Sequence, residues 1–228
     1  MSTKILIINY KAYEEAFTKG IDIAKYSGEL SKSSGVSIIV SPPFTILKET
    51  VKSAKTIAQG VSKLDPGAFT YHVTWFELKQ AAVAGTLLNH SENRYSNPKT
   101  GELDYSSLKM AVEKCGNSGL ETYVCVQNLE EAKEVLKMKP TGIAYEPPEL
   151  IGGNISVSNS KPEIVKEFCS LVKSNSNSLA LIGAGIKGRE DAEKSVELGS
   201  DGLLVASGIM KSDDFKLVIN DLVNGLNK

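Results

Sequence analysis

The sequence predicts a (β/α)₈ barrel, in which eight parallel strands are each followed by a helix and residues 1–228 form one domain. Three observations lead to this fold class. Eight short runs rich in apolar and β-branched residues recur along the chain. Helical patterns, with apolar residues three and four positions apart, separate these runs. No linker or shift in composition divides the 228 residues, a length that suits a barrel folding as one unit.

The expected strands are nearly continuously apolar, as parallel strands covered on both faces should be. In chain order they are KILIIN (4–9), VSIIVS (36–41), TIAQGV (56–61), AGTLLN (84–89), ETYVCV (121–126), TGIAYE (141–146), LALIG (179–183) and DGLLVA (201–206). Helical spacing lies between them in segments such as EEAFTKGIDIAKYSGELSKS, NLEEAKEVLKMK and GREDAEKSVELGS. An open, doubly wound sheet is the alternative fold, because strands are easily miscounted from one sequence.

Charge and cysteine content narrow the class of protein. The chain has 26 Lys and Arg against 27 Asp and Glu, which argues against nucleic acid as a partner because phosphate backbones select for clustered basic residues. Its three cysteines form no C-x-x-C pair and no even-numbered disulfide set, which favours a reducing compartment. No apolar run is long enough for a signal-peptide core or a membrane span. We therefore expect a soluble cytoplasmic protein without a membrane partner.

Active sites of such barrels lie at the carboxyl ends of the strands, so the residues directly after each strand are the candidates. The first strand ends in NYK, which supplies the amide of Asn9 and the ammonium of Lys11. These groups suit an anionic or carbonyl-bearing substrate. A helix-capping Asn beside a solvent-exposed Lys is the alternative.

His90 directly follows the fourth strand, in NHSEN. The next residues, Ser91 and Glu92, resemble the start of a helix, whose positive end would favour a neutral imidazole. A neutral imidazole can donate a hydrogen bond to a carbonyl and polarise it. A packing or capping histidine is the alternative.

Glu146 ends the sixth strand and opens the segment EPPELIGG. Its carboxylate could abstract a proton from a carbon beside a carbonyl, and a buried ion pair with a lysine is the alternative. Pro147 and Pro148 stiffen the backbone, whereas Gly152 and Gly153 loosen it. The pattern indicates a lid that closes over a substrate rather than a plain turn.

Small residues follow the last two strands, in GAGIKG (183–188) and ASGIM (206–210). The first matches G-x-G-x-x-G, but a dinucleotide site would need it in an opening βαβ unit. Barrels commonly bind phosphate with the loops after strands seven and eight, so these loops predict a phosphate site, with tight turns as the alternative. No cluster has metal-ligand spacing, and no G-x-S-x-G motif occurs, so we expect neither a metal nor a cofactor. Together the candidates suit isomerase chemistry, or related aldolase or epimerase chemistry, on a small phosphorylated substrate.

Five motifs in order, NYK, LLNHSENR, AYEPPELIGG, GAGI and LLVASGIMK, resemble triosephosphate isomerase, especially its shorter archaeal form. The resemblance implies a TIM barrel that interconverts dihydroxyacetone phosphate and D-glyceraldehyde 3-phosphate through an enediol, in glycolysis and gluconeogenesis. It implies that Glu146 is the general base and His90 the neutral electrophile, a pairing for which this family is known. It implies that Lys11 supplies positive charge and that Asn9 donates a hydrogen bond to the substrate.

The resemblance also implies a lid at about residues 147–154, in which Ile151 and Gly152 bring backbone near the phosphate. Main-chain N–H groups after strands seven and eight would complete the phosphate site, from Gly185, Ala206 and Ser207.

Two segments depart from the family pattern. The lid ends in IGGN where the family usually has IGTG, and the loop DPGAFTYHVTWFE matches poorly beyond Thr70. In the family this loop reaches into a neighbouring subunit, so the resemblance implies a homo-oligomer, either dimer or tetramer. His72, within the loop, receives no role.

Two rivals remain. One is another phosphate-binding barrel, such as a ribulose-phosphate epimerase or a barrel from tryptophan synthesis, although the metal-binding His and Asp of such epimerases are missing. The other is an inactive barrel that serves as a binding scaffold. The joint presence of Asn9, Lys11, His90 and Glu146 argues against such decay.

Overall fold

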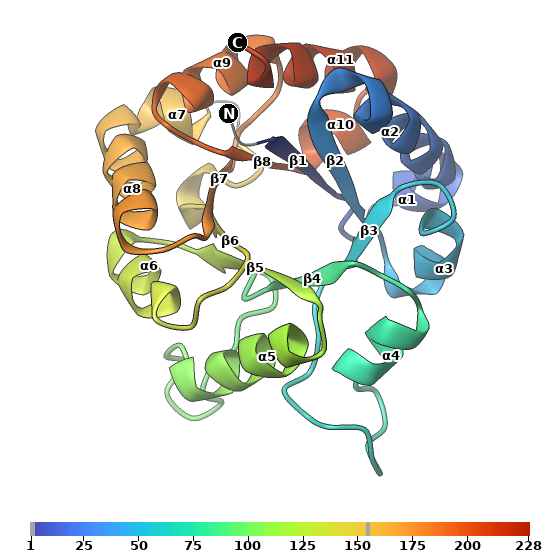
Figure 1. Ribbon diagram of the computed structural model, residues 1–228, viewed down its shortest axis with the longest axis vertical. Helices are drawn as coiled ribbons and strands as arrows, with labels where there is room; N and C mark the ends of the chain where they lie inside the picture. Colours follow the sequence, from blue (N-terminus) through green and yellow to red (C-terminus); the bar gives the residue numbers. More distant parts are fainter. Residues whose placement is uncertain (1–2, 154–155) are drawn as a thin grey trace.

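The computed structural model describes residues 3–153 and 156–228, and these form a closed barrel of eight parallel strands (Figure 1). Each strand pairs with the next in chain order, and β8 returns to pair with β1. The barrel prediction is confirmed and the open sheet is wrong. The strands are β1 (Lys4–Asn9), β2 (Val36–Ser41), β3 (Lys55–Ala58), β4 (Gly85–Leu88), β5 (Glu121–Val126), β6 (Gly142–Tyr145), β7 (Leu179–Gly183) and β8 (Gly202–Val205).

Helices surround the barrel as an outer ring (Figure 1). They are α1 (Glu15–Thr18), α2 (Gly20–Ser34), α3 (Leu47–Thr50), α4 (Trp75–Gln80), α5 (Tyr105–Asn117), α6 (Leu129–Leu136), α7 (Val157–Ser160), α8 (Pro162–Asn175), α9 (Arg189–Glu197), α10 (Ser207–Met210) and α11 (Phe215–Leu226). Two short 3₁₀ turns, η1 (Phe44–Ile46) and η2 (Pro148–Leu150), lie in the loops after β2 and β6.

Strand alternation decides which side chains fill the barrel. Successive side chains of a strand point to opposite faces, so Ile5 and Ile7 of β1 point inward and Asn9 follows them at the carboxyl end. One packed cluster fills the interior: Ile5, Ile7, Ile39, Ile57, Leu87, Tyr123, Cys125, Ala144, Leu181 and Leu204. This apolar cluster fills the barrel interior, and the polar residues lie at the carboxyl ends of the strands.

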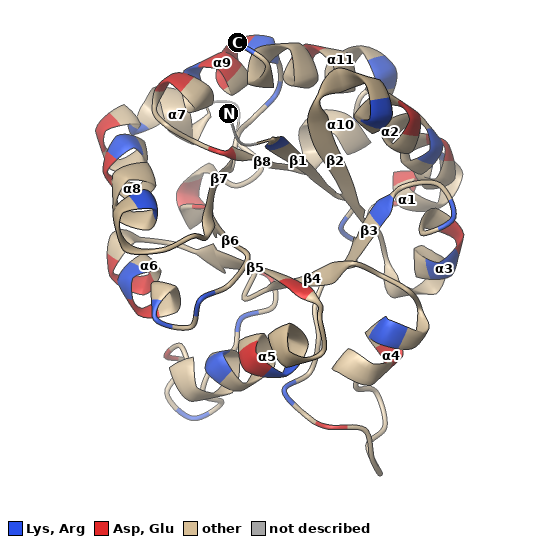
Figure 2. Ribbon diagram, viewed as in Figure 1, with Lys and Arg blue, Asp and Glu red and all other residues tan. Residues whose placement is uncertain are grey.

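The outward faces of the strands pack against the helices in a second, larger core. Leu6 and Ile8 of β1 belong to it, together with Phe168 of α8 and Leu222 of α11, all fully buried. Lys and Arg alternate with Asp and Glu around the helical ring, whereas the strands carry few charges (Figure 2). The charged side chains thus lie on the helical ring, and the barrel strands are mainly apolar.

One expected helix is divided in two. The segment from residue 14 to 33 forms α1 and α2, and Lys19 between them leaves helical geometry with φ −132°. The hydroxyl of buried Tyr10 donates to the Gly20 carbonyl at 2.9 Å, and a Cβ on Gly20 would lie 3.0 Å from the Tyr10 ring. The helix therefore restarts where the chain passes over this ring.

No helix within residues 3–153 and 156–228 is long and apolar enough to cross a membrane.

Two helical glycines should respond oppositely to alanine. A Cβ on Gly28 of α2 would lie 1.8 Å from the Ser53 carbonyl oxygen, so Gly28→Ala must displace backbone and destabilise by about 1–3 kcal/mol or more. A Cβ on Gly116 of α5 meets nothing within 4 Å, so Gly116→Ala should stabilise by up to about 1 kcal/mol through helix propensity. Thermal unfolding of both variants tests this, and Tm shifts of the same sign would contradict the packing described.

Candidate active site

All nine residues proposed for the site from sequence line one cleft at the carboxyl ends of the strands. They are Asn9, Lys11, His90, Glu146, Ile151, Gly152, Gly185, Ala206 and Ser207. Their loops follow β1, β4, β6, β7 and β8, so residues up to 198 positions apart in the chain share one cleft. Tyr13, Ala184 and Ile186 are among the further residues that line it.

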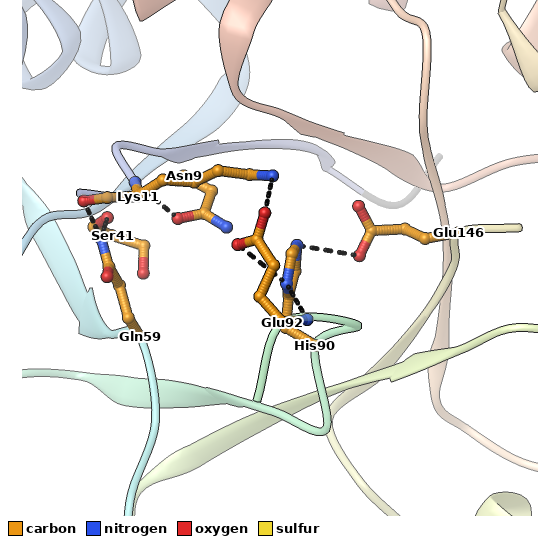
Figure 3. A network of polar contacts seen from close by, with 7 residues as sticks. All are labelled: Asn9, Lys11, Ser41, Gln59, His90, Glu92 and Glu146. Carbon is orange, nitrogen blue, oxygen red and sulfur yellow. Dashed lines mark hydrogen bonds and ion pairs between the residues drawn. The ribbon is translucent and has the colours of Figure 1, made fainter. Parts of the chain in front are cut away.

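Glu146 directly follows β6, and its backbone N–H donates to the Val126 carbonyl at 2.9 Å. The residue is only 6% exposed, and its Oε2 has no hydrogen-bond partner among the described residues. The imidazole of His90 lies nearby, with its Nε2 3.7 Å from Oε2 (Figure 3). No lysine of the described chain is within salt-bridge distance, so the alternative of a Lys–Glu146 pair is wrong. The carboxylate is therefore buried and left open to a ligand.

His90 follows β4 and turns its two ring nitrogens to different partners. The Glu92 backbone N–H donates to Nδ1 at 3.3 Å, which requires an unprotonated Nδ1 and leaves the proton on Nε2. The Glu92 carboxylate also lies 3.5 Å from Nδ1 and would favour the opposite tautomer. We favour the amide contact, because that carboxylate is 59% exposed and already paired at 2.7 Å with Lys11. The arrangement fits a neutral imidazole with Nε2–H facing Glu146.

The expected helix start at Ser91 and Glu92 is wrong. These residues form a turn, and α5 begins only at Tyr105. A single backbone N–H of this turn, that of Glu92, contacts the imidazole in place of the expected helix N-terminus. Polar residues after a strand initiate a turn as readily as a helix, which is why the pattern misled us.

Lys11 projects its ammonium across the mouth of the barrel. Its Nζ pairs with Glu92 Oε1 at 2.7 Å, and its side chain is only 13% exposed (Figure 3). Asn9 is buried and its Oδ1 accepts from the Lys11 backbone N–H at 3.0 Å. Asn9 caps no helix, since α1 follows Glu14, so the capping alternative is wrong.

Sequence reasoning missed two members of this network, Glu92 and Gln59. For Glu92 the sequence pattern predicts only a helix start. Gln59 follows β3 and donates to the carbonyls of Lys11 and Ser41 (Figure 3). A signal was present, because Gln59 is two residues beyond the inward-facing Ile57 and should therefore also point inward.

Cys125 lies in the barrel interior. Burial raises the pKa of its thiol well above the ordinary value, and the nearby Glu146 carboxylate raises it further. Burial also raises the pKa of Cys115 to about 11 and of Cys169 to about 12. All three are free thiols that stay protonated near neutral pH, so none has the character of a nucleophile.

The loop after β7 gives Glu146 room and turns backbone towards the cleft. A Cβ on Gly183 would lie 2.5 Å from Glu146 Cγ, so only glycine leaves the carboxylate where it is. Ala184 and Gly185 then adopt left-handed conformations, with φ +71° and +69°. The second small-residue loop leads directly into α10 at Ser207.

The segment after Glu146 begins with two prolines and reaches a glycine in a left-handed conformation. Pro147 precedes η2, and Gly152 has φ +72°. Glu149, on the outer side, forms an ion pair with Lys161. The last residue of the expected lid, Asn154, lies outside the described residues.

Within the described part of the chain, no three His, Cys, Asp or Glu side chains are grouped so that they could hold a metal ion.

Comparison with known proteins gives one consistent family. The family model described as triosephosphate isomerase matches residues 4–222. A curated triosephosphate isomerase of Methanocaldococcus jannaschii is 37% identical over 96% of this chain and 98% of its own. That of Methanopyrus kandleri is 38% identical over 97% of both chains, and that of Caldivirga maquilingensis 37% identical over 99% of both.

Proposed function

The chain belongs to the triosephosphate isomerase family, and we propose that Glu146 is the base that carries the family's reaction here. The protein is an isomerase that interconverts dihydroxyacetone phosphate and D-glyceraldehyde 3-phosphate through an enediol intermediate, a step of glycolysis and gluconeogenesis. One observation carries the assignment of Glu146. Its carboxylate is buried, its Oε2 lacks a hydrogen-bond partner among the described residues, and it faces the imidazole of His90.

In the proposed mechanism, Glu146 Oε2 takes a proton from the carbon beside the substrate carbonyl and returns it to the neighbouring carbon. The electron pair of the C–H bond becomes the second bond between the two carbons, the π pair of the carbonyl moves onto its oxygen, and a proton donated to that oxygen by His90 completes the enediol. A base needs a free lone pair near the reacting carbon, and Oε2 has one because no described side chain occupies it. Because this position is buried, water does not solvate the carboxylate and so does not lower its reactivity as a base.

We propose that His90 stabilises the negative charge that develops on the substrate oxygen. Its Nε2–H, fixed by the Glu92 amide on Nδ1, would donate to that oxygen and shuttle a proton between the two oxygens of the enediol. Asn9 would donate from its side-chain amide, and the ammonium of Lys11 would supply positive charge from the other side. Fixed donors of this kind act in the transition state without reorganisation, which makes them effective.

The phosphate group is proposed to lie against main-chain N–H groups of Gly152, Gly185 and Ser207, with Ile151 and Ala206 beside it. The left-handed turn at Ala184 and Gly185 supports this, because successive residues in such turns present their N–H groups to an anion. The segment that begins at Pro147 would close over the substrate as a lid. Closure would exclude water and protect the enediol from losing its phosphate.

We also propose that the chain assembles as a homo-oligomer through the loop after β3. Phe69 is 51% exposed, and the whole side chain of Tyr71 is solvent-accessible. They border a cleft of about 940 Å³ that the loop forms with residues 93–98. Exposed aromatic groups beside a large cleft are typical of an interface, and Thr70 between them would then approach the partner's active site. A cytoplasmic location is proposed with this role, since all three cysteines are free thiols.

Shortening the base tests its role. Glu146→Asp should withdraw the carboxylate by about 1.5 Å, the length of one C–C bond. A misplacement of this size should lower kcat by about a hundredfold or more, with a much smaller change in KM. A coupled assay of the two triose phosphates, run with EDTA, measures both constants.

Glu163→Asp is the matched control, since Glu163 is exposed on α8, and it should keep wild-type activity. Near-normal turnover of Glu146→Asp would contradict the assignment of the base. A folded wild-type protein without turnover would favour the inactive scaffold or another phosphorylated substrate.

The proposed assembly is tested by replacing its exposed aromatic residues. Light scattering after gel filtration should give a dimer or tetramer for the wild-type chain. Phe69→Ser combined with Tyr71→Ser should shift it towards smaller species. Leu217→Ser removes another exposed apolar side chain, from α11 on another side of the barrel, and should leave the mass unchanged. A fully active wild-type monomer at micromolar concentration would contradict this proposal.

A further inference from the structure

Lys11 holds an unfavourable backbone conformation at the centre of the site. Its φ of +48° is in the left-handed region, which residues other than glycine rarely adopt. Such a conformation persists only where the surrounding structure holds it, and it is concentrated at functional sites. Since φ sets the direction of the Cα–Cβ bond, relaxation of this residue would turn the Lys11 side chain away from the cleft.

Side chains hold the Lys11 backbone from two sides. Asn9 Oδ1 accepts from its N–H at 3.0 Å, and Gln59 Nε2 donates to its carbonyl at 2.9 Å. The N–H is thus tied to the strand that precedes Lys11, whereas the carbonyl is tied to a different strand. Figure 3 shows both contacts on the side of Lys11 away from Glu146.

The Gln59 amide makes a second hydrogen bond, to the Ser41 carbonyl at the end of β2, at 3.1 Å. The same carbonyl accepts from the backbone N–H of Tyr10 at 3.0 Å. One side-chain –NH₂ group therefore joins the ends of three neighbouring strands, β1, β2 and β3. Both of its hydrogens are used, so a shift of Lys11 would leave a donor of a partly buried amide unpaired.

We propose that Gln59 is a positioning residue for catalysis, which fixes the strained backbone of Lys11 and so aims its ammonium into the cleft. The proposal rests on the proposed function of Lys11. Gln59 itself has no contact with the reacting atoms in this account. Its amide donates to two carbonyls, and neither a carboxylate nor a thioether at this position could do so.

A double-mutant cycle separates this role from a general contribution to the fold. Gln59→Met keeps the approximate side-chain size and removes both donors. It should lower kcat/KM by about tenfold or more when Lys11 is present, because a displacement of about 1 Å has effects of this order. In a Lys11→Met background it should change kcat/KM by less than about twofold, since no ammonium remains to be aimed. Activities are measured at high enzyme concentration, and thermal unfolding verifies that each variant folds.

Gln127→Met is the matched control, because Gln127 is a half-buried glutamine at the end of another strand, β5, and should keep wild-type kcat/KM in both backgrounds. Equal losses from Gln59→Met with and without Lys11 would overturn the inference, and so would the absence of a loss. If Lys11→Met alone kept full activity, the proposed role of Lys11 would fail instead.

A second variant and a second readout cover the remaining cases. If Gln59→Met does not fold, Gln59→Asn retains an amide but shortens its reach, and the same cycle applies. If Lys11→Met has no measurable activity, calorimetric binding of inorganic phosphate to the four proteins replaces kcat/KM. Weaker binding upon Gln59 substitution only in the presence of Lys11 is expected, and equal weakening in both backgrounds would overturn the inference.

Discussion

The site depends on a buried carboxylate whose hydrogen-bonding capacity is only partly used by the surrounding residues. Glu146 is 6% exposed, and one of its oxygens has no hydrogen-bond partner among the described residues. Burying a charged group without a partner costs stability, so a chain selected for stability alone would pair or expose it. The residues around Glu146 leave this oxygen without a partner. Gly183 leaves space for the side chain, His90 stops 3.7 Å away, and no described lysine comes within salt-bridge distance. In the proposed mechanism, the substrate is the missing partner.

The barrel can accommodate the free-energy cost of burying Glu146 because the residues that stabilise the fold and those that line the cleft occupy different positions along the strands. Its interior is filled by an apolar cluster that contains one inward residue of β1 after another, Ile5 and then Ile7. The next inward position, Asn9, is polar and begins the cleft. Glu146 likewise stands two residues after the inward-facing Ala144 of β6. In β1 and β6 the inward residues along the strand therefore pack the core, whereas the position at the carboxyl end lines the cleft, and the loops add further lining residues without disturbing the core.

The sequence was informative where a repeating pattern or a strand end carried the signal. Apolar runs located every strand, and the positions after them located Asn9, Lys11, His90 and Glu146 in one cleft. It failed where the outcome depended on contacts between distant segments. The polar run at Ser91 and Glu92 does not reveal whether a turn or a helix follows, and the restart of a helix at Gly20 requires the ring of Tyr10. The hydrogen bond from Gln59 to Lys11 joins residues 48 positions apart, so no local sequence pattern predicts it.

Isomerisation in D₂O tests most directly the claim that Glu146 moves a proton between two carbons. A proton held by a carboxylate exchanges with solvent, so glyceraldehyde 3-phosphate made from dihydroxyacetone phosphate should carry deuterium at the carbon that receives it. Mass spectrometry or proton NMR of the trapped product measures this label. We predict that a large fraction of the first-turnover product is labelled. Product formed without any deuterium would mean that hydrogen passes directly between the carbons as hydride, and it would contradict the account.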